Sequence, residues 1–382
     1  MDFDLSEDLQ MVRDAAREFA DKWVAPGAAE RDLSERFPIE QFKKAAEYGF
    51  TGIAVPEAYG GAGLSNVALC LVLFEVNRAC ASTGVTLSVH NSLCCGPMTK
   101  FGTEAQKLSL VSRLAQGEWL GAYSLSEANS GSDAAALVCG ARADGDRFIL
   151  DGTKLWVTSA SHADMFVVFA RTQKGLKKHE GITAFLVERT TPGFRVSKRE
   201  EKMGIRASST CELVFEECSV PRENVLGEVG RGFKIAMDTL DGGRIGIAAQ
   251  GIGIAQASLD AAVRYAKERK AFGRSIAEFE AIQFKIAEMK ARIEAASLMT
   301  LRAAWLKDKG RPHTAEAAQA KFLASRTANF AARESVQIHG GAGYLEDFPV
   351  ERFMRDARIT EIYEGTTEIQ KLVIARSVLE AK

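Results

Sequence analysis

The feature that most constrains this fold is a change of residue pattern at two points along the chain. After the N-cap residue Ser6, apolar residues recur every three or four positions as far as Pro26, which is typical of an amphipathic helix. From about Gly121, short runs rich in β-branched and aromatic residues replace that spacing, and Asp144-Gly145 and Asp151-Gly152 predict turns. After Gly230 the spacing of long helices returns.

These patterns predict a helical first part, a small β domain and a helical bundle. The first part includes helices over 41–48, 66–79 and 104–113. The middle part includes strands over 148–150, 155–158, 165–171, 182–187 and 212–215. The last part includes helices over 255–270, 281–307 and 315–338.

Composition excludes several classes of function. The formal net charge is -1 over 382 residues, so no global electrostatic footprint for nucleic acid is present. No window approaches the roughly 18 uninterrupted apolar residues that a membrane span needs. The seven cysteines form no CxxC pair, which argues against a disulfide framework or a zinc site and for a reducing compartment. The N-terminus shows no export pattern, and we expect a cytoplasmic protein, or a mitochondrial matrix protein if this is a processed eukaryotic form.

Common catalytic motifs are missing from the sequence. No HExxH, GxSxG or P-loop pattern occurs, and the five histidines are too scattered to suggest a metal cluster. The segment Gly251-Ile252-Gly253 resembles part of a dinucleotide fingerprint, but it lies in a helical pattern and follows no strand. We expect its small residues to let helices approach closely.

Five segments together resemble the acyl-CoA dehydrogenase family, flavoproteins that oxidise the Cα–Cβ bond of acyl-CoA thioesters. In chain order they are YSLSEANSGSD (123–133), LWVTS (155–159), RKAFG (269–273), QIHGGAGY (337–344) and RDARITEIYEGTTEIQ (355–370). The chain looks most similar to the short-chain, butyryl-CoA type in ASTGVTLSVHNSL (81–93), KMGIRASST (202–210) and GFKIAMDTLDGGRIGIA (232–248). The resemblance implies an α+β multidomain fold with a helical domain (1–120), a middle β-barrel or sandwich domain (121–229) and a C-terminal four-helix bundle (230–382).

The resemblance also gives a role to a glutamate that, taken alone, reads as a solvated turn residue. It implies that Glu364, in IYEGT, is the base that removes the α-proton, and that its backbone N–H helps to stabilise the enolate together with a ribityl hydroxyl of FAD. The β-hydride then passes to flavin N5. Relatives that keep the base elsewhere carry it at the position of Gly243, which has no side chain. Because an ordinary Glu has a pKa of about 4.3, this task needs a dry site that raises the pKa.

Carried over residue by residue, the resemblance implies two groups of FAD contacts. The first comes from one subunit and consists of Tyr123, Leu125, Ser126, Gly131, Ser132, Trp156 and Thr158, with Thr158 at flavin N5 and Thr366 and Glu368 approaching from the tail. The second comes from another subunit and consists of Arg269, Phe272, Gln337, Ile338, Gly340 and Gly341. Two residues depart from the family pattern. Ala128 replaces a usual Pro, and Glu280 replaces a flavin-contacting Gln whose hydrogen bond an ionised Glu cannot donate.

For the substrate channel, the resemblance implies Ser132, Asp241, Arg244 and Gly365 as lining residues, with Arg244 orienting the base. Glutaryl-CoA relatives hold a distal carboxylate with an Arg at the position of Gly84, so a dicarboxylyl substrate is disfavoured. A homotetramer that passes electrons to an electron-transferring flavoprotein is the expected assembly. Three alternatives remain open: an acyl-CoA oxidase, a dehydrogenase of branched substrates such as 2-methylbutyryl-CoA, and a catalytically silent FAD-binding assembly protein.

Overall fold

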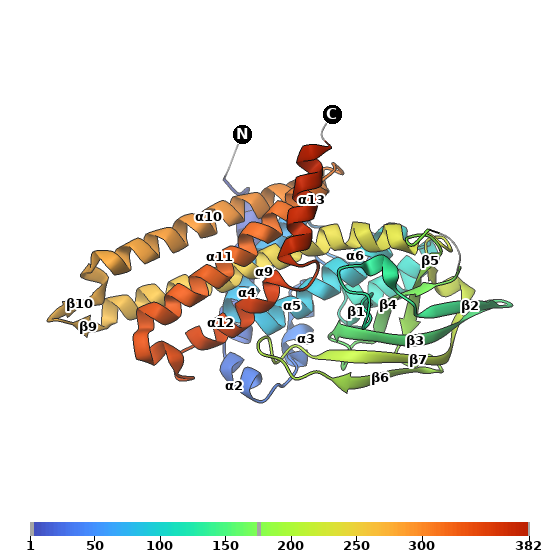
Figure 1. Ribbon diagram of the computed structural model, residues 1–382, viewed down its shortest axis with the longest axis horizontal. Coiled ribbons are helices and arrows are strands. Elements are labelled where there is room, and N and C mark those ends of the chain that lie inside the picture. Colours follow the sequence, from blue (N-terminus) through green and yellow to red (C-terminus); the bar gives the residue numbers. More distant parts are fainter. Residues whose placement is uncertain (1–3, 174–176, 381–382) are drawn as a thin grey trace.

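The computed structural model describes residues 4–173 and 177–380 of the chain. A helical N-terminal part, a middle β-sheet part and a helical C-terminal part follow one another, which confirms the predicted fold class (Figure 1). The boundaries at 120/121 and 229/230 stay predictions.

The N-terminal part begins with the predicted amphipathic helix. The Ser6 side chain accepts a hydrogen bond from the Leu9 N–H at the start of α1 (Glu7–Phe19), and a π-helical turn over Ala20–Val24 continues it. Ala16 and Phe19 are buried in the core that this helix covers. The other helices are α2 (Ala28–Leu33), α3 (Ile39–Glu47), α4 (Asn66–Ala79), α5 (Ala81–Val89), α6 (Gly96–Phe101), α7 (Glu104–Gln106) and α8 (Ser112–Ala115).

The middle part is one sheet in the order β6-β7-β3-β2-β4-β5-β8, with β1 parallel to β4. All but the last residue of both β4 and β5 are buried. One face of these strands packs against the start of α9 (Gly232–Glu268), and the other packs against aromatic residues of β3 and β6, as in the ring contacts Phe148–Phe185 and Phe166–Phe194. The strands are β1 (Gly121–Ser124), β2 (Gly140–Asp144), β3 (Arg147–Thr158), β4 (Met165–Arg171), β5 (Ile182–Glu188), β6 (Phe194–Arg199), β7 (Thr210–Pro221) and β8 (Val225–Leu226).

One of the two predicted Asp-Gly turns is wrong. The first is confirmed, because Asp144 pairs with Arg147 across a tight turn in which Gly145 has φ +60°. The second, Asp151-Gly152, lies inside β3 and joins two segments predicted as separate strands. The pairing of β3 with β7 shifts register between Leu150 and Gly152, so this dipeptide makes a β-bulge.

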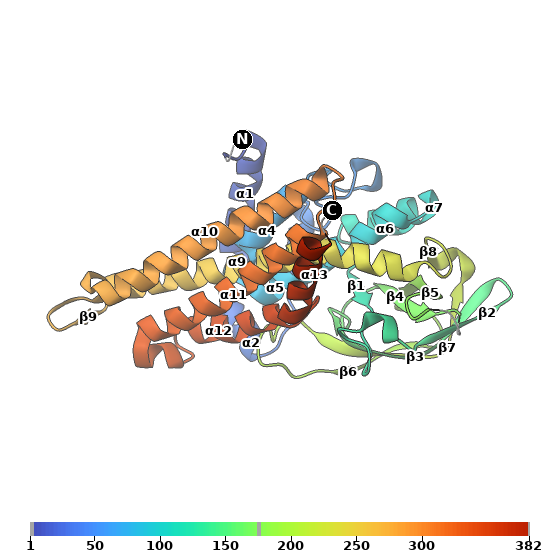
Figure 2. The same ribbon diagram turned by 45° about the horizontal axis from the view of Figure 1, so that its top comes forward.

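The C-terminal part contains the long helices α9 (Gly232–Glu268), α10 (Glu280–Asp308) and α11 (Thr314–His339), which lie side by side in Figures 1 and 2. The shorter helices α12 (Val350–Arg358) and α13 (Thr367–Leu379) follow, and α13 stands at a steep angle to the long helices in Figure 1. Helix α9 ends at Glu268, two residues before the predicted end, because the hairpin of β9 (Lys270–Ala271) and β10 (Arg274–Ser275) begins there. This hairpin lies at the opposite end of the molecule from the sheet.

The small residues of α9 mark close helix crossings, as the sequence predicts. A Cβ atom on Gly251 would lie 3.0 Å from the Ala324 carbonyl of α11. A Cβ atom on Gly253 would lie 2.7 Å from the Phe74 carbonyl of α4. The seven cysteines are free and buried, and no helix in the described ranges is long and apolar enough to cross a membrane.

Candidate active site

Glu364 lies in the short connection between the 3-10 turn Ile359–Glu361 and α13. Its φ is +52° and that of Gly365 is +92°, so the chain makes a left-handed bend at this point. The residue as a whole is half-buried, but Oε2 is shielded from solvent and has no hydrogen-bond partner among the described residues. A carboxyl oxygen buried in this way is costly unless it serves a reaction or a ligand.

Gly243 of α9 makes room for this carboxylate. A Cβ atom built on Gly243 would lie 2.2 Å from Glu364 Oε2 and 2.6 Å from Leu93 Cδ2. No side chain therefore fits at position 243 while Glu364 keeps its place. Residues 243 and 364, the two positions at which members of the resembled family carry the base, are thus direct neighbours in space.

Burial and two cations together set the charge state of Glu364. Burial raises the pKa of Glu364 to about 7, and the positive charges of Lys321 and then Arg244 act in the opposite direction. Burial also raises the pKa of the Tyr123 hydroxyl, and the negative charge of Glu364 adds to that rise. Tyr123, Arg244 and Lys321 come from β1, α9 and α11, so elements of both the middle and the C-terminal part meet around one carboxyl group.

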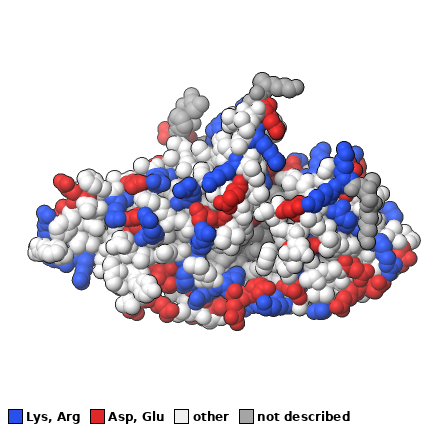
Figure 3. All heavy atoms as spheres, viewed as in Figure 1, with Lys and Arg blue, Asp and Glu red and all other residues white. Residues whose placement is uncertain are grey.

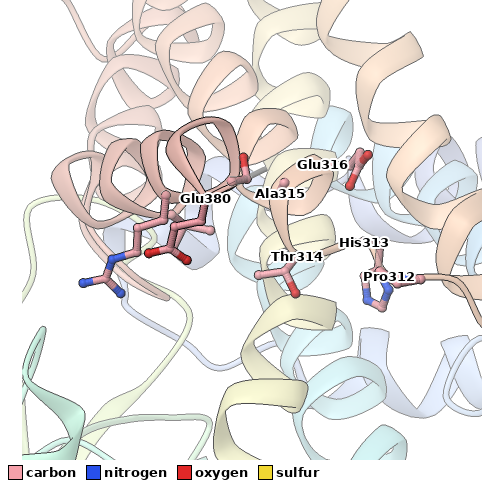
Figure 4. Close-up of a pocket in the computed structure, with 9 residues that line it drawn as sticks. Pro312, His313, Thr314, Ala315, Glu316 and Glu380 are labelled. Carbon is pink, nitrogen blue, oxygen red and sulfur yellow. The ribbon is translucent and has the colours of Figure 1, made fainter. Parts of the chain in front are cut away.

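A chain of polar contacts leads from Arg244, whose charge acts on this carboxyl, toward the surface. Arg244 Nη1 donates to Asp241 Oδ1 at 2.6 Å, and the Thr314 hydroxyl donates to Asp241 Oδ2 at 2.6 Å. Thr314 belongs to a cavity of about 560 Å³ between the start of α11 and the end of α13. Figure 4 shows Thr314 and His313 on one side of this cavity and Glu380 on the other.

An internal ion pair braces the loop that follows β1. Lys154 is fully buried and donates to Glu127 Oε1 at 2.7 Å and to the Leu125 carbonyl at 3.0 Å. Glu127 in turn accepts from the Val138 and Cys139 backbone N–H groups at 2.7 and 3.0 Å. Because each charged partner is also hydrogen-bonded to the backbone, the pair can hold this loop in one shape.

The loop and the end of β3 present groups that suit a flat, polar ligand. Trp156 has φ +58° and is 56% exposed, and Thr158 follows it on the same strand. In the described part of the chain, the buried oxygens Tyr123 Oη, Ser124 Oγ and Ser159 Oγ have no hydrogen-bond partner. Figure 3 shows a hollow on this face of the molecule, among mixed charges. Unpaired polar atoms on the strands that flank this loop, together with an exposed ring, fit the flavin that the resemblance implies.

The structure does not bring all predicted flavin residues together within one chain. Leu125, Ser126, Gly131 and Ser132 lie on the loop after β1. The start of this loop lies next to the Trp156 segment, because the Leu155 N–H donates to the Ser126 carbonyl. Arg269 and Phe272 lie at the hairpin beyond α9, and Gln337, Ile338, Gly340 and Gly341 lie at the end of α11. Helix α9 has 37 residues, about 55 Å at 1.5 Å per residue, and separates that end from the sheet.

The remaining predicted residues lie on or beside the helices already described. Thr366 caps α13 by accepting from the Ile369 N–H, and Glu368 is exposed in its first turn. Glu280, which replaces the expected Gln, is exposed at the start of α10. Among the residues that the structure describes, no group of His, Cys, Asp and Glu could hold a metal ion.

Sequence reasoning missed two residues that hold the Glu364 segment. Lys321 Nζ donates to the Gly365 carbonyl at 2.6 Å, and Gln370 Nε2 donates to the same carbonyl at 2.8 Å. One signal was available, because Lys321 is a single cation among Ala317, Ala318 and Ala320. A charged residue on the small, apolar face of a helix predicts a buried partner.

Comparison with protein families gives matches over nearly the whole chain. The N-terminal domain of acyl-CoA dehydrogenase matches residues 6–118, the middle domain matches residues 122–218, and the C-terminal domain matches residues 230–379.

Individual relatives are similar over full length. The mitochondrial short-chain specific acyl-CoA dehydrogenase of Mus musculus is 51% identical over 99% of this chain and 92% of its own length. The short-chain specific acyl-CoA dehydrogenase of Clostridium acetobutylicum is 48% identical over 99% of this chain and 100% of its own length.

Solved structures show the same similarity. Butyryl-CoA dehydrogenase from Megasphaera elsdenii superimposes with a TM-score of 0.97 at 45% identity, over 99% of this chain and 100% of that one. A chain from a study of the electron transferring flavoprotein of Acidaminococcus fermentans has a TM-score of 0.98 at 48% identity, with the same coverage. A Mycobacterium smegmatis glutaryl-CoA dehydrogenase in complex with FADH2 has a TM-score of 0.93 at 29% identity, over 98% of this chain and 95% of that one. The chain therefore belongs to the acyl-CoA dehydrogenase family.

Proposed function

We propose that this protein is an FAD-dependent acyl-CoA dehydrogenase that introduces a trans-2,3 double bond into short-chain acyl-CoA thioesters. The observation that carries the proposal is the buried carboxyl group of Glu364. It faces Gly243, and the positive charges of Lys321 and Arg244 act on it. Such a group suits proton abstraction next to a thioester carbonyl.

Glu364 is the proposed general base. Its pKa of about 7 makes it a much stronger base than an ordinary Glu, while a large fraction stays ionised near neutral pH. The Glu364 backbone N–H donates to no acceptor in the described backbone hydrogen bonds, so it is free to donate to the thioester oxygen as negative charge develops there. The Gln370 amide holds the other side of this segment by donating to the Glu364 carbonyl at 3.3 Å.

The proposed cofactor site uses the loop after β1 and the end of β3. FAD, when bound, supplies the two-electron acceptor for the β-hydride, which no side chain can accept. Leu125, Ser126, Gly131 and Ser132 would hold it from the loop, and Tyr123, Trp156 and Thr158 from the two strands. Thr366 and Glu368 at the start of α13 would approach it from the tail.

The proposed thioester channel runs past Asp241, Arg244, Ser132 and Gly365. The Asp241–Thr314 hydrogen bond connects Arg244 with the cavity at the start of α11, and we place the entrance of the polar part of the substrate there. A dicarboxylyl substrate is disfavoured because Gly84, at the position where glutaryl-CoA relatives keep an Arg, offers no charge to a distal carboxylate. A Cβ atom on Gly84 would lie 2.1 Å from Asn77 Oδ1, so an Arg at position 84 would displace a buried side chain.

The proposed assembly is a homotetramer in which each flavin contacts two subunits. Arg269, Phe272, Gln337, Ile338, Gly340 and Gly341 would reach the flavin of a second copy, because their end of the bundle is far from the sheet of their own chain. An electron-transferring flavoprotein is the proposed acceptor. We further propose a cytoplasmic location, or the mitochondrial matrix for a processed eukaryotic form.

The deciding experiment is an anaerobic titration of the purified protein with acyl-CoAs of increasing length, followed by flavin absorbance. We expect butyryl-CoA or a close neighbour to bleach the flavin fastest, and to give the highest kcat/KM when an electron acceptor is added for turnover. A higher value for octanoyl-CoA or glutaryl-CoA would contradict the proposed preference, and 2-methylbutyryl-CoA tests the branched alternative. Admission of air after reduction separates a dehydrogenase, which reoxidises slowly, from an oxidase. Failure of every acyl-CoA to bleach the flavin would indicate a silent assembly protein.

A further inference from the structure

Lys321 is a buried cation in the middle of α11. Lys321 is only 1% exposed. The buried residues of the same helix near it are all small: Ala317, Ala318, Ala320 and Ala324. Burial lowers the pKa of Lys321 to about 8, and the negative charges of Glu364 and Glu361 work against that lowering. A lysine is rarely buried unless a specific partner compensates for its lost hydration.

The partner of Lys321 is the backbone of the Glu364 segment. Lys321 Nζ donates to the Gly365 carbonyl at 2.6 Å. Gln370, which is fully buried on α13, donates to the same carbonyl at 2.8 Å and to the Glu364 carbonyl at 3.3 Å. Donors from two helices thus hold two successive carbonyls in a bend where Glu364 has φ +52°. A residue other than Gly keeps such a conformation only where its surroundings impose it.

The same ammonium group acts on the Glu364 carboxylate through space. Glu364 Oε2 has no hydrogen-bond partner among the described residues, so Lys321 does not occupy the oxygen that must take up a proton. The groups that face Glu364 are Lys321 from α11, Arg244 from α9, Tyr123 from β1 and its own neighbour Tyr363. Of these, Lys321 lowers the pKa of Glu364 most, against the larger effect of burial.

An ion pair made directly with the carboxylate would be a poorer arrangement for catalysis. It would fill the acceptor positions of the base and lower its basicity strongly. A cation held one peptide away keeps the carboxyl partly ionised and leaves its oxygens free. Because Lys321 donates to the Gly365 carbonyl and not to the carboxylate, it lowers the pKa of Glu364 without blocking the oxygen that accepts the proton.

We propose that Lys321 is a positioning residue with two effects: its hydrogen bond to the Gly365 carbonyl supports the bend that orients Glu364, and its charge, held at that carbonyl, keeps the Glu364 carboxylate ionised. This inference rests on the proposed role of Glu364 as the base. Lys321 itself touches neither the thioester nor the reacting atoms.

The first test measures the charge of Glu364 without turnover. Infrared difference spectra of the flavin-loaded protein are recorded across pH, and the carboxyl band that Glu364→Gln removes is followed. The pH dependence of this band gives the pKa of Glu364. Lys321→Met is expected to raise that pKa by about one unit or more, because an opposite charge is lost near a buried acid. An unchanged pKa would overturn the inference, even if the wild-type protein reduces no flavin with acyl-CoA.

The second test follows flavin reduction by butyryl-CoA in single turnovers across pH. The wild-type rate is expected to rise with pH as Glu364 ionises, and we call this rise the acid limb. In Lys321→Met the acid limb is expected to move to higher pH. The reduction rate should then fall about tenfold at low pH and recover much of its value at high pH. An equal loss at every pH would show that Lys321 only supports the fold. Gly365 keeps the Gln370 donor in this variant, so no carbonyl is left unpaired.

Two further variants keep the tests decisive. Lys321→Gln retains a donor for the Gly365 carbonyl without the charge, and it is expected to shift the acid limb as Lys321→Met does, so it decides the matter if the Met variant fails to fold. Lys285→Met is the matched control, because Lys285 pairs with Glu334 on α11. The control should leave the pH profile of reduction in place, and a comparable shift there would contradict a specific role for Lys321.

Discussion

At the scale of single residues, Glu364 carries the chemistry, and the change to Gln tests it most directly. Glu364→Gln keeps the shape of the side chain but cannot take up the α-proton, so acyl-CoA binding should survive. Flavin reduction should fall by about 10⁴-fold, at the upper end of general-base contributions, because the glutamine amide is not a base. Stopped-flow reduction without oxygen measures the rate, and a spectral titration measures binding. Reduction at close to the wild-type rate would remove Glu364 from its role.

The thermal stability of Glu364→Gln gives an independent check, because the direction of the change in Tm follows from the raised pKa. Burial raises the pKa of Glu364 to about 7, so the folded protein holds this proton more tightly than the unfolded chain. Ionisation of Glu364 therefore costs stability as pH rises from its unfolded pKa, about 4.3, to about 7. Glu364→Gln should show an equal or higher Tm than the wild type at pH 8, and a smaller gain at pH 5. A large loss of Tm at both pH values would indicate a structural role.

The pH dependence of the wild-type rate follows from the same group. The base must be ionised, so single-turnover reduction should rise with pH through about 7 and level off above it. The control is butyryl-CoA binding, measured over the same range to separate loss of affinity from loss of base. A rate that is flat from pH 5 to pH 8 would show that Glu364 stays ionised throughout and that burial does not set its pKa.

Gly243 allows a test of placement. Because a Cβ atom there lies 2.2 Å from Glu364 Oε2, Gly243→Glu in the wild-type background should abolish activity. Adding Gly243→Glu to Glu364→Gln, the direct way to move the base, fails for the same reason, since the introduced glutamine fills the same space as the native glutamate. The variant Gly243→Glu with Glu364→Gly removes the clash with Oε2, so only the end of the Leu93 side chain, 2.6 Å from the Cβ atom, has to move, and we expect partial recovery of flavin reduction. Recovery in the Glu364→Gln background instead would show that the two side chains do not compete for one space.

At the scale of elements, α9 organises the helical part because small residues let it approach α4 and α11. Gly253→Ala should lower stability by about 1–3 kcal/mol, since its Cβ atom would meet the α4 backbone at 2.7 Å. The gain of about 1 kcal/mol in helix propensity does not offset a clash with a backbone that cannot move. Gly140→Ala in β2 is the matched control, because the nearest atom lies 4.0 Å from its Cβ atom. Calorimetric Tm values compare the two, and equal values would contradict the proposed close crossing.

At the scale of the whole molecule, the distribution of flavin residues predicts an oligomer. Phe272 is 97% exposed at the tip of the hairpin beyond α9, far from the sheet of its own chain. We expect the protein to purify yellow, with about one FAD per chain, and as a tetramer by light scattering. Phe272→Asp should weaken flavin retention and assembly together, while Phe272→Tyr should preserve both. A monomer that keeps its full flavin would contradict the shared site.

The sequence by itself determined the elements whose formation depends on local pattern. The spacing of apolar residues between Ser6 and Pro26 predicted α1, and the Ala-rich segments predicted α10 and α11 to within one residue. These succeed because hydrophobic periodicity and capping act within a few turns of one helix. The motif around Glu364 also indicated the family, because its residues stand together in the chain.

Only the tertiary structure decided how distant residues share one space. The Asp151-Gly152 pair is typical of a turn, yet pairing with β7 holds it inside β3 as a bulge, since long-range hydrogen bonds outweigh local preference. Likewise, nothing near Lys321 in the sequence shows that its ammonium group reaches the Gly365 carbonyl, 44 residues further along. Burial, and with it the pKa of Glu364, depends on the packing of β1, α9 and α11 around one carboxyl group, and no local sequence pattern encodes that packing.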